Sequence, residues 1–189
     1  MAPNAHHIID NSTIVGSVSA AISDATTVVG TSARQRRAPS QHIHPKQLAK
    51  LMDRGPISIL FGPEDTGLTN NDLQHVDQLL TIPTIENKSL NLGQSVTVIC
   101  AALGVSQSQA NPSIPSSIGA ARKAMLTKSL IEVLTHVGYL KGQSDRNVYA
   151  TLYQLISRFR ATDQEAKAAL GMIKKIRRRI VNTNHEISS

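Results

Sequence analysis

Three turns in this 189-residue chain carry small, hydroxyl-bearing or acidic residues directly after an apolar run. They are "VVGTSARQRR" after Val29, "FGPEDTGL" after Leu60 and "TIPTIENKSLNLG" after Leu80. If the apolar runs are neighbouring parallel strands, all three turns emerge on one edge of a sheet, where open α/β sheets bind ligands. The turns lack the G-x-x-x-x-G-K-[ST] pattern of a phosphate loop, so they favour a neutral or cationic nucleotide-like ligand. Their small residues would let the backbone approach a base or ribose closely.

The histidines and the single cysteine do not indicate a metal site or a disulfide. His42 and His44 have the spacing of an H-x-H metal pair, but no third ligand is evident, so we expect no metal. Cys100 is the single cysteine, which excludes a disulfide within the chain, and its place in an apolar stripe predicts that it is a core residue.

The elements that must position these turns are short strands alternating with helices. Strands are predicted at His6–Asp10, Thr26–Ser32, Ile57–Phe61 and Gln78–Pro83, with a short helix in "SVSAAIS". Thr69 and Asp72 form a capping pair for another helix. A further helix would bury one stripe, made of Leu92, Val96, Ile99, Cys100 and Leu103. This alternation predicts an α/β fold with a doubly wound parallel sheet over residues 1–105.

The rest of the chain is predicted to be helical. Residues 106–118 are polar and contain prolines, which is typical of a linker, and residues 119–181 form a basic helical region. Gly138 should end its first helix, and Thr162 with Glu165 should begin the last. The inward-facing residues of its helices are expected to be Leu126, Leu130, Val133, Leu134 and Val137, then Val148, Leu152, Leu155, Ile156 and Phe159, then Ala166, Leu170, Ile173 and Ile180. Three helices are few for a free-standing bundle, so we expect them to pack on the first domain or on a second subunit.

Charge is distributed unevenly along the chain. Residues 1–105 carry seven Lys and Arg against eight Asp and Glu, whereas residues 106–189 carry thirteen against five. This asymmetry indicates a polyanionic partner, most simply nucleic acid; a basic face kept for solubility is the alternative. The sequence has no apolar run of membrane-spanning length and no signal-peptide pattern at its start, so a soluble cytoplasmic protein is expected.

The three blocks "VGTSAR", "FGPEDTGLTNNDL" and "IPTIENKSLNL", in this order, resemble the last three sequence blocks of the SpoU-type branch of the SPOUT RNA 2′-O-ribose methyltransferases. The likeness is greatest to the bacterial tRNA enzymes that modify the anticodon loop. It implies a doubly wound domain with a C-terminal trefoil knot, S-adenosylmethionine as methyl donor, tRNA as substrate and a homodimer with the site at its interface.

The resemblance also implies roles for individual residues. Glu64, Ser89 and Asn91 fall on catalytic positions, and Arg34, Arg36 and Arg37 on an RNA-facing turn. The implied cofactor contacts are Thr31, Ser32, Ala33, Gly62, Ile82, Lys88, Ser89 and Leu90. From the residues alone, Glu64 could equally satisfy backbone amides, and Ser89 and Asn91 could cap the following helix.

One block of the family pattern is absent. The family begins with an N-x-G motif followed by an arginine that acts on the target ribose, and nothing in residues 1–23 resembles it. We therefore expect the first strand–helix–strand unit to be missing. Three hypotheses follow: a tRNA 2′-O-methyltransferase, a truncated or inactive relative that binds RNA or dimerises, and a nucleotide-binding regulator unrelated to RNA.

Overall fold

A computed structural model of the chain describes residues 6–33, 41–52, 55–84, 89–106, 117–140 and 145–187. Its centre is a parallel sheet of four strands: β1 (Thr27–Thr31), β2 (Gln41–Ile43), β3 (Ile57–Leu60) and β4 (Gln78–Leu80). Their order in space is β2-β4-β1-β3. The predicted α/β class with a parallel sheet is confirmed, as are three of its predicted strands.

One predicted strand was wrong, and one short strand was not predicted. His6–Asp10, predicted as a strand, is the helix α1, and all five of its residues are exposed. Its two isoleucines are adjacent in sequence, so they do not alternate as the two faces of a strand would require. Strand β2 was missed because only Ile43 of its three residues is buried, so no apolar run marks it.

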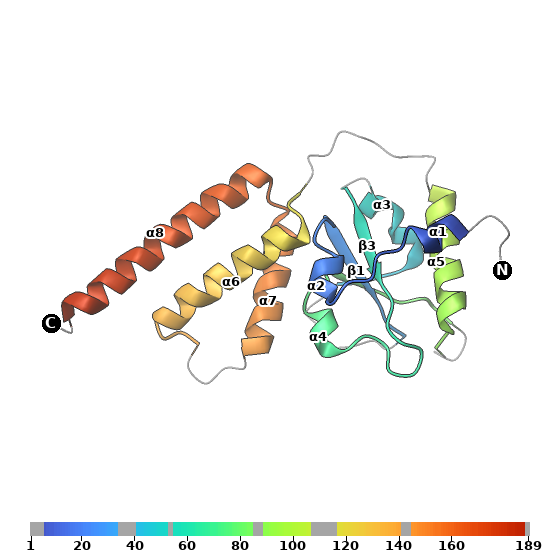
Figure 1. Cartoon of the computed structure of the whole chain (residues 1–189), viewed down its shortest axis with the longest axis horizontal. Coiled ribbons are helices and arrows are strands. Elements are labelled where there is room, and N and C mark those ends of the chain that lie inside the picture. The colour runs from blue at the N-terminus through green and yellow to red at the C-terminus, as the bar shows by residue number, and fades with distance from the viewer. Residues whose placement is uncertain are drawn as a thin grey trace.

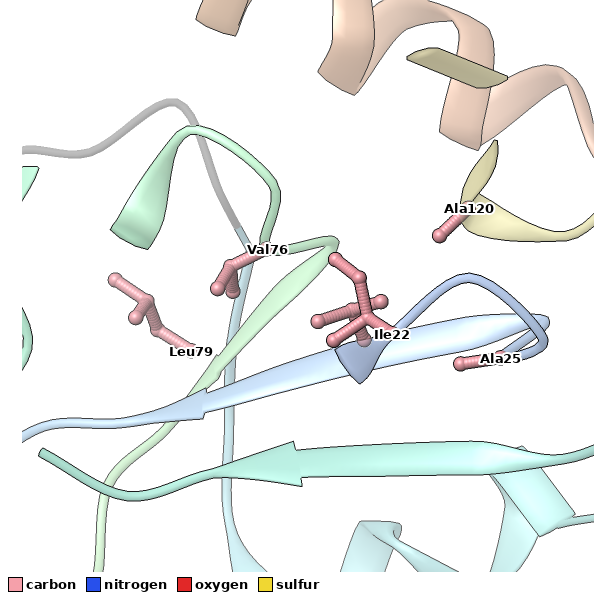
Figure 2. Packing of buried hydrophobic residues seen from close by; sticks show 6 residues of the cluster. Ile22, Ala25, Val76, Leu79 and Ala120 are labelled. Atoms are coloured by element: carbon pink, nitrogen blue, oxygen red, sulfur yellow. The ribbon is translucent and has the colours of Figure 1, made fainter. Parts of the chain in front are cut away.

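Helices cover both faces of the sheet (Figure 1). On one face lie α2 (Val18–Ala21), α4 (Asn70–Leu73) and the start of α6, around a core that contains Val28, Val76 and Leu79. Figure 2 shows Ala120, the first residue of α6, beside Ile22 and Ala25 of this core. On the other face lie the 3-10 turn η1 (Pro45–Gln47), α3 (Ala49–Met52) and α5 (Leu92–Ser106), with a core of Val29, Ile43, Leu48, Leu51, Leu80 and Ile99.

Only part of the predicted stripe on α5 is buried. Ile99 is 1% exposed and Leu103 packs on the same core, whereas Leu92 is 39% exposed and Val96 is 37% exposed. Cys100 is also exposed, so its assignment to the core was wrong. The helix contacts η1 and α3 along one narrow side, and the apolar residues beyond that side face outward.

The remaining helices are α6 (Ala120–His136), α7 (Asp145–Phe159) and α8 (Asp163–Ile187). Helix α6 lies between the other two and contacts both. Gly138, with φ 73°, follows the end of α6, and the Thr162–Glu165 capping box precedes α8, both as predicted. The predicted divisions at residues 105 and 119 stay predictions; most of the expected linker lies outside the described residues.

The stripe predicted for α7 is partly wrong. Leu155 is 47% exposed and Phe159 is 72% exposed, and Val137 after α6 is 54% exposed. The fully buried side chain of α7 is instead Tyr153, with Gln154 at 4% exposure. The helix turns this polar side toward the α/β domain, which confirms that the helical region packs on the first domain.

The described residues contain neither a membrane-spanning helix nor a metal-binding cluster. None of the described helices is long and apolar enough to cross a membrane. Within the same residues, no group of three His, Cys, Asp or Glu side chains is arranged to hold a metal ion.

Candidate functional site

A cavity of about 260 Å³ lies at the carboxyl ends of β1, β3 and β4. The three turns singled out in the sequence all contribute to its wall, because the strands that precede them are parallel neighbours. Its lining residues are Thr31–Ala33, Phe61–Leu68, Leu73, Leu80, Ile82, Ser89, Leu90, Leu92 and Ser95. The cavity therefore occupies the position at which open α/β sheets bind ligands.

The turn after β3 folds back tightly on itself at Gly62. A Cβ atom at this position would come within 2.2 Å of the backbone of Gly67 and Leu68, so no other residue fits without movement of the backbone. Gly67 has φ +66°, and its N–H donates to the Pro63 carbonyl at 2.8 Å. These two glycines give the acidic turn its shape, and that shape forms one wall of the cavity.

Side-chain and backbone hydrogen bonds fix the turn after β1 to both neighbouring strands. The Thr31 hydroxyl donates to the carbonyl of Leu60, the last residue of β3, at 2.9 Å. The Ser32 N–H donates to the carbonyl of Leu80, the last residue of β4, at 3.0 Å. The edge of the cavity formed by Thr31 and Ser32 is thereby held in register with the other two turns.

One hydrogen bond connects the acidic turn to the start of α5, and two others cap that helix. The Glu64 carboxylate accepts from the backbone N–H of Leu92 at 3.4 Å. The Asn91 side-chain oxygen accepts from the Gln94 N–H at 2.8 Å, and the Gln94 side chain accepts from the Asn91 N–H at 3.3 Å. This reciprocal pair caps α5, and Glu64 adds a negative charge at the positive end of the helix. Both side chains therefore position the backbone of Ser89–Leu92.

The structure brings most of the predicted site residues together. Among the predicted cofactor contacts, the cavity is lined by Thr31, Ser32, Ala33, Gly62, Ile82, Ser89 and Leu90. Glu64 also lines it, whereas Asn91 does not. Lys88, Arg34, Arg36 and Arg37 lie outside the described residues. The roles assigned to all of these residues stay predictions.

Sequence reasoning missed several residues of the wall. Phe61, Leu73 and Leu80 supply apolar surface, and Asp65 and Thr66 supply polar groups. Ser95 also lines the cavity, one helical turn beyond Asn91, and its N–H donates to the Asn91 carbonyl at 3.0 Å. The periodicity of a helix that begins at Leu92 could have indicated Ser95, because residues three apart, such as Leu92 and Ser95, lie on one face.

The geometry agrees with a comparison of the sequence with protein families. The model described as "SpoU rRNA Methylase family" matches residues 1–101, which is more than half of the chain. The chain belongs to this family. The matched region contains all three turns that line the cavity, together with the whole sheet.

Individual relatives extend the similarity into the helical region. The tRNA (cytidine/uridine-2′-O-)-methyltransferase TrmJ of Yersinia pestis (strain Pestoides F) is 29% identical over 189 aligned residues, which cover 93% of this chain and 74% of the relative. The protein of the same name from Pectobacterium atrosepticum is 36% identical over 104 residues, covering 52% of this chain and 43% of the relative.

Solved structures show the same fold. TrmJ from Z. mobilis ZM4 superposes with a TM-score of 0.78 at 24% identity, covering 93% of this chain and 78% of that structure. A probable methylase family protein from Haemophilus influenzae Rd KW20 has a TM-score of 0.50 at 26% identity, with 96% and 78% of the two chains covered.

Proposed function

We propose that this protein transfers a methyl group from S-adenosylmethionine to a ribose 2′-hydroxyl of tRNA. The observation that carries the proposal is the convergence of three strand-end turns on one cavity in a SpoU rRNA methylase family member. The TrmJ relatives are named tRNA (cytidine/uridine-2′-O-)-methyltransferases, which supports tRNA as the RNA that is modified. The reaction would then take place in the cytoplasm, where tRNA is processed.

The cavity wall suits the chemical groups of this cofactor. Phe61, Leu80, Ile82 and Leu90 offer apolar surface for a flat base. The hydroxyls of Thr31, Ser32 and Ser89 are of the type that hydrogen-bond to a ribose. Glu64 and Asp65 place negative charge at the wall, which is favourable for a ligand that carries sulfonium and ammonium groups.

When bound, S-adenosylmethionine supplies an electrophilic methyl group on a positively charged sulfur. The contribution of the protein is then mainly alignment of the ribose oxygen with that methyl group, together with acceptance of the hydroxyl proton. Ser89 lies at the cavity, and its hydroxyl donates to the Leu90 carbonyl at 3.2 Å. Glu64 and Asn91 would hold the Ser89–Leu92 backbone in place through the bonds at the start of α5.

The basic side of α8 is the proposed RNA surface of the helical region. Lys174, Lys175, Arg177, Arg178 and Arg179 are all exposed and occupy two turns of this helix. Such a cluster can neutralise several backbone phosphates irrespective of base sequence. Arg34, Arg36 and Arg37 would contribute further phosphate contacts beside the cavity.

The knot and the dimer are part of the same proposal. The knot is implied by the resemblance of the three turns to the SPOUT methyltransferases, and the strand order β2-β4-β1-β3 is in keeping with a doubly wound sheet. Helix α5 supports a homodimer: Leu92 and Val96 lie one turn apart on the same side of this helix, and each is more than a third exposed. A second copy that covers this surface would bring its own residues close to the cavity, whose wall includes Leu92.

The experiment that tests the proposal uses the full chain with unmodified tRNA and S-adenosylmethionine labelled with tritium in the methyl group. Alkali-stable dinucleotides that carry the label are expected, because a 2′-O-methyl group blocks cleavage at that ribose. Ser89→Ala should lower kcat/KM about tenfold or more if its hydroxyl is in contact with the reacting groups. Ser12→Ala is the matched control, because Ser12 is exposed and does not line the cavity.

The second candidate function is a relative that binds RNA without modifying it. The exposed basic cluster of α8 is the observation that favours it, because such a cluster can bind backbone phosphates whatever takes place at the cavity. A gel shift with tRNA that is independent of cofactor, together with no alkali-stable product, would establish this alternative and exclude the methyltransferase.

A further inference from the structure

A buried carboxylate lies at the opposite end of the sheet from the cavity. Asp77 immediately precedes β4 and is 9% exposed. Its side chain accepts hydrogen bonds from the Val28 N–H at 2.8 Å, the Lys123 ammonium at 2.7 Å and the Ser157 hydroxyl at 2.5 Å. One side chain therefore connects β1 with both α6 and α7.

The partners of Asp77 make further contacts to the same strand ends. Lys123 is 4% exposed, donates to the Thr26 carbonyl at 2.9 Å and lies 5.9 Å from the centre of the Tyr153 ring. The Gln154 side-chain amide donates to the Val76 carbonyl. Helices α6 and α7 are thus attached to the amino ends of β1 and β4 by a network of charged and polar groups. We refer to Asp77, Lys123, Gln154 and Ser157 as the junction.

Charged groups at such a contact constrain geometry more than apolar groups do. Two apolar surfaces can slide and still bury the same area, whereas a buried ion pair is stable only when its charges and remaining hydrogen-bonding groups are all satisfied. The junction therefore favours one orientation of α6 and α7 on the sheet. Alternative orientations would leave Asp77 or Lys123 buried without its counter-ion.

The orientation of α6 also determines where the basic side of α8 lies. Arg122 of α6 pairs with Asp163 of α8 at 2.9 Å, and Glu132 of α6 pairs with Arg177 of α8 at 2.5 Å. Leu126 of α6 and Ala166 of α8 share a third small core. The position of α8 is thus determined by its contacts with α6, and the position of α6 is determined by the junction.

We infer that Asp77 is a positioning residue for the RNA substrate: by holding Lys123 and Ser157, it sets the basic side of α8 at a fixed orientation relative to the cavity, so that RNA bound to α8 presents its ribose there. The inference rests on the proposed function. It assigns to the amino end of the sheet a role in a reaction that takes place at the carboxyl end.

The test compares Asp77→Asn, the double variant Asp77→Asn/Lys123→Met and the surface control Asp24→Asn in the full chain. Calorimetry with S-adenosylmethionine should give dissociation constants within roughly twofold of the wild type for all three, because none of these residues lines the cavity. The tRNA kcat/KM should fall about tenfold in Asp77→Asn and stay unchanged in Asp24→Asn. Amide exchange should accelerate in α6 and α7 and stay unchanged in β1 and β3.

The double variant separates positioning from stability. Removal of the isolated buried ammonium should restore the thermal midpoint, yet the tRNA kcat/KM should remain at least about fivefold below the wild type because the ion pair that selects the orientation is gone. Full recovery of kcat/KM in the double variant would show that Asp77 contributes only folding stability, and would overturn the inference. So would a parallel loss of cofactor binding in Asp77→Asn.

Failure of the proposed function gives a different pattern. If the wild type binds tRNA without methylating it, the methyltransferase proposal fails, and the inference is then judged on tRNA dissociation constants, which should rise about fivefold in Asp77→Asn. Equal constants for the wild type and Asp77→Asn, or a wild type that does not bind tRNA, would overturn the inference itself.

Discussion

The two ends of the parallel sheet use polar residues in opposite ways. At the carboxyl ends, Thr31, Ser89 and Glu64 line an open cavity and stay partly accessible. At the amino ends, Asp77 and Lys123 are almost fully buried, and each makes more than one hydrogen bond. Open polar groups can receive a ligand, whereas satisfied ones hold parts of the chain together. We therefore call the carboxyl ends of the strands, which form the cavity, the binding end of the sheet. The amino ends, where Asp77 and Lys123 lie, are the assembly end.

The largest expected effect comes from breaking the ion pair at the assembly end. Lys123→Ala removes the counter-ion of a buried carboxylate, so the free energy of unfolding should fall by about 3–5 kcal/mol. Arg122→Ala, on the adjacent residue, removes an ion pair with Asp163 whose side chains are 35% and 52% exposed, and its effect should be much smaller. Urea unfolding of both variants measures the difference. Equal losses would mean that burial of the Lys123 pair does not matter.

The next effect should appear at the binding end. Gly62→Ala places a methyl group against the Gly67 and Leu68 backbone, so we expect a loss of about 1–3 kcal/mol in stability and loss of saturable cofactor binding. Gly16→Ala is the matched control, because no atom outside its neighbours lies within 4 Å of the added methyl group. Calorimetry and thermal unfolding give both quantities. Normal cofactor affinity in Gly62→Ala would contradict the assigned shape of the turn.

The sequence predicted the binding end better than the assembly end. The three strand-end turns and the Thr69–Asp72 and Thr162–Glu165 caps were identified because each depends on residues close in sequence. The Asp77–Lys123 pair joins residues 46 apart, and nothing in the local sequence of either distinguishes it from an exposed charge. Cys100 and Phe159 were placed in the core from helical spacing, but spacing defines a stripe without showing whether anything covers it. Local sequence patterns do not identify which residues far apart in the chain contact each other in the fold.

A smaller effect should follow from releasing the start of α5. Glu64→Ala removes the carboxylate that accepts from Leu92 N–H, so stability should fall by about 0.5–1 kcal/mol and cofactor affinity by roughly threefold. Thr69→Ala removes the N-cap of α4. Thr69 does not line the cavity, so this variant should lower stability without lowering cofactor affinity. Calorimetry distinguishes the two variants. A loss of affinity in Thr69→Ala as large as in Glu64→Ala would remove the specific link between Glu64 and the cavity.

The smallest effect concerns pH and the assembly end. Burial, together with nearby Lys128, lowers the pKa of His75 below its usual value of 6.5, while Asp72 acts in the opposite direction. His75 meets the rings of Tyr149 and Tyr153 edge-on at 5.8 and 6.2 Å. Because the unfolded chain binds the proton more readily, the stability that neutral His75 contributes is present above pH 6.5 and is lost as the pH falls below it. His75→Phe keeps a ring in this position and should flatten the dependence of the thermal midpoint between about pH 7.5 and 5.5.

The separation of Asp77 from its partners along the chain also has a consequence for synthesis. A ribosome that adds about 5–20 residues per second delivers Asp77 roughly 2 to 9 s before Lys123, which lies 46 residues later. By the time Lys123 is added, every residue of the cavity wall up to Ser95 has been synthesised, while the carboxylate still lacks its counter-ion and is hydrated. We therefore expect the binding end to reach its shape first in the nascent chain. The arrival of α6 and α7 then expels water from Asp77 and completes the junction.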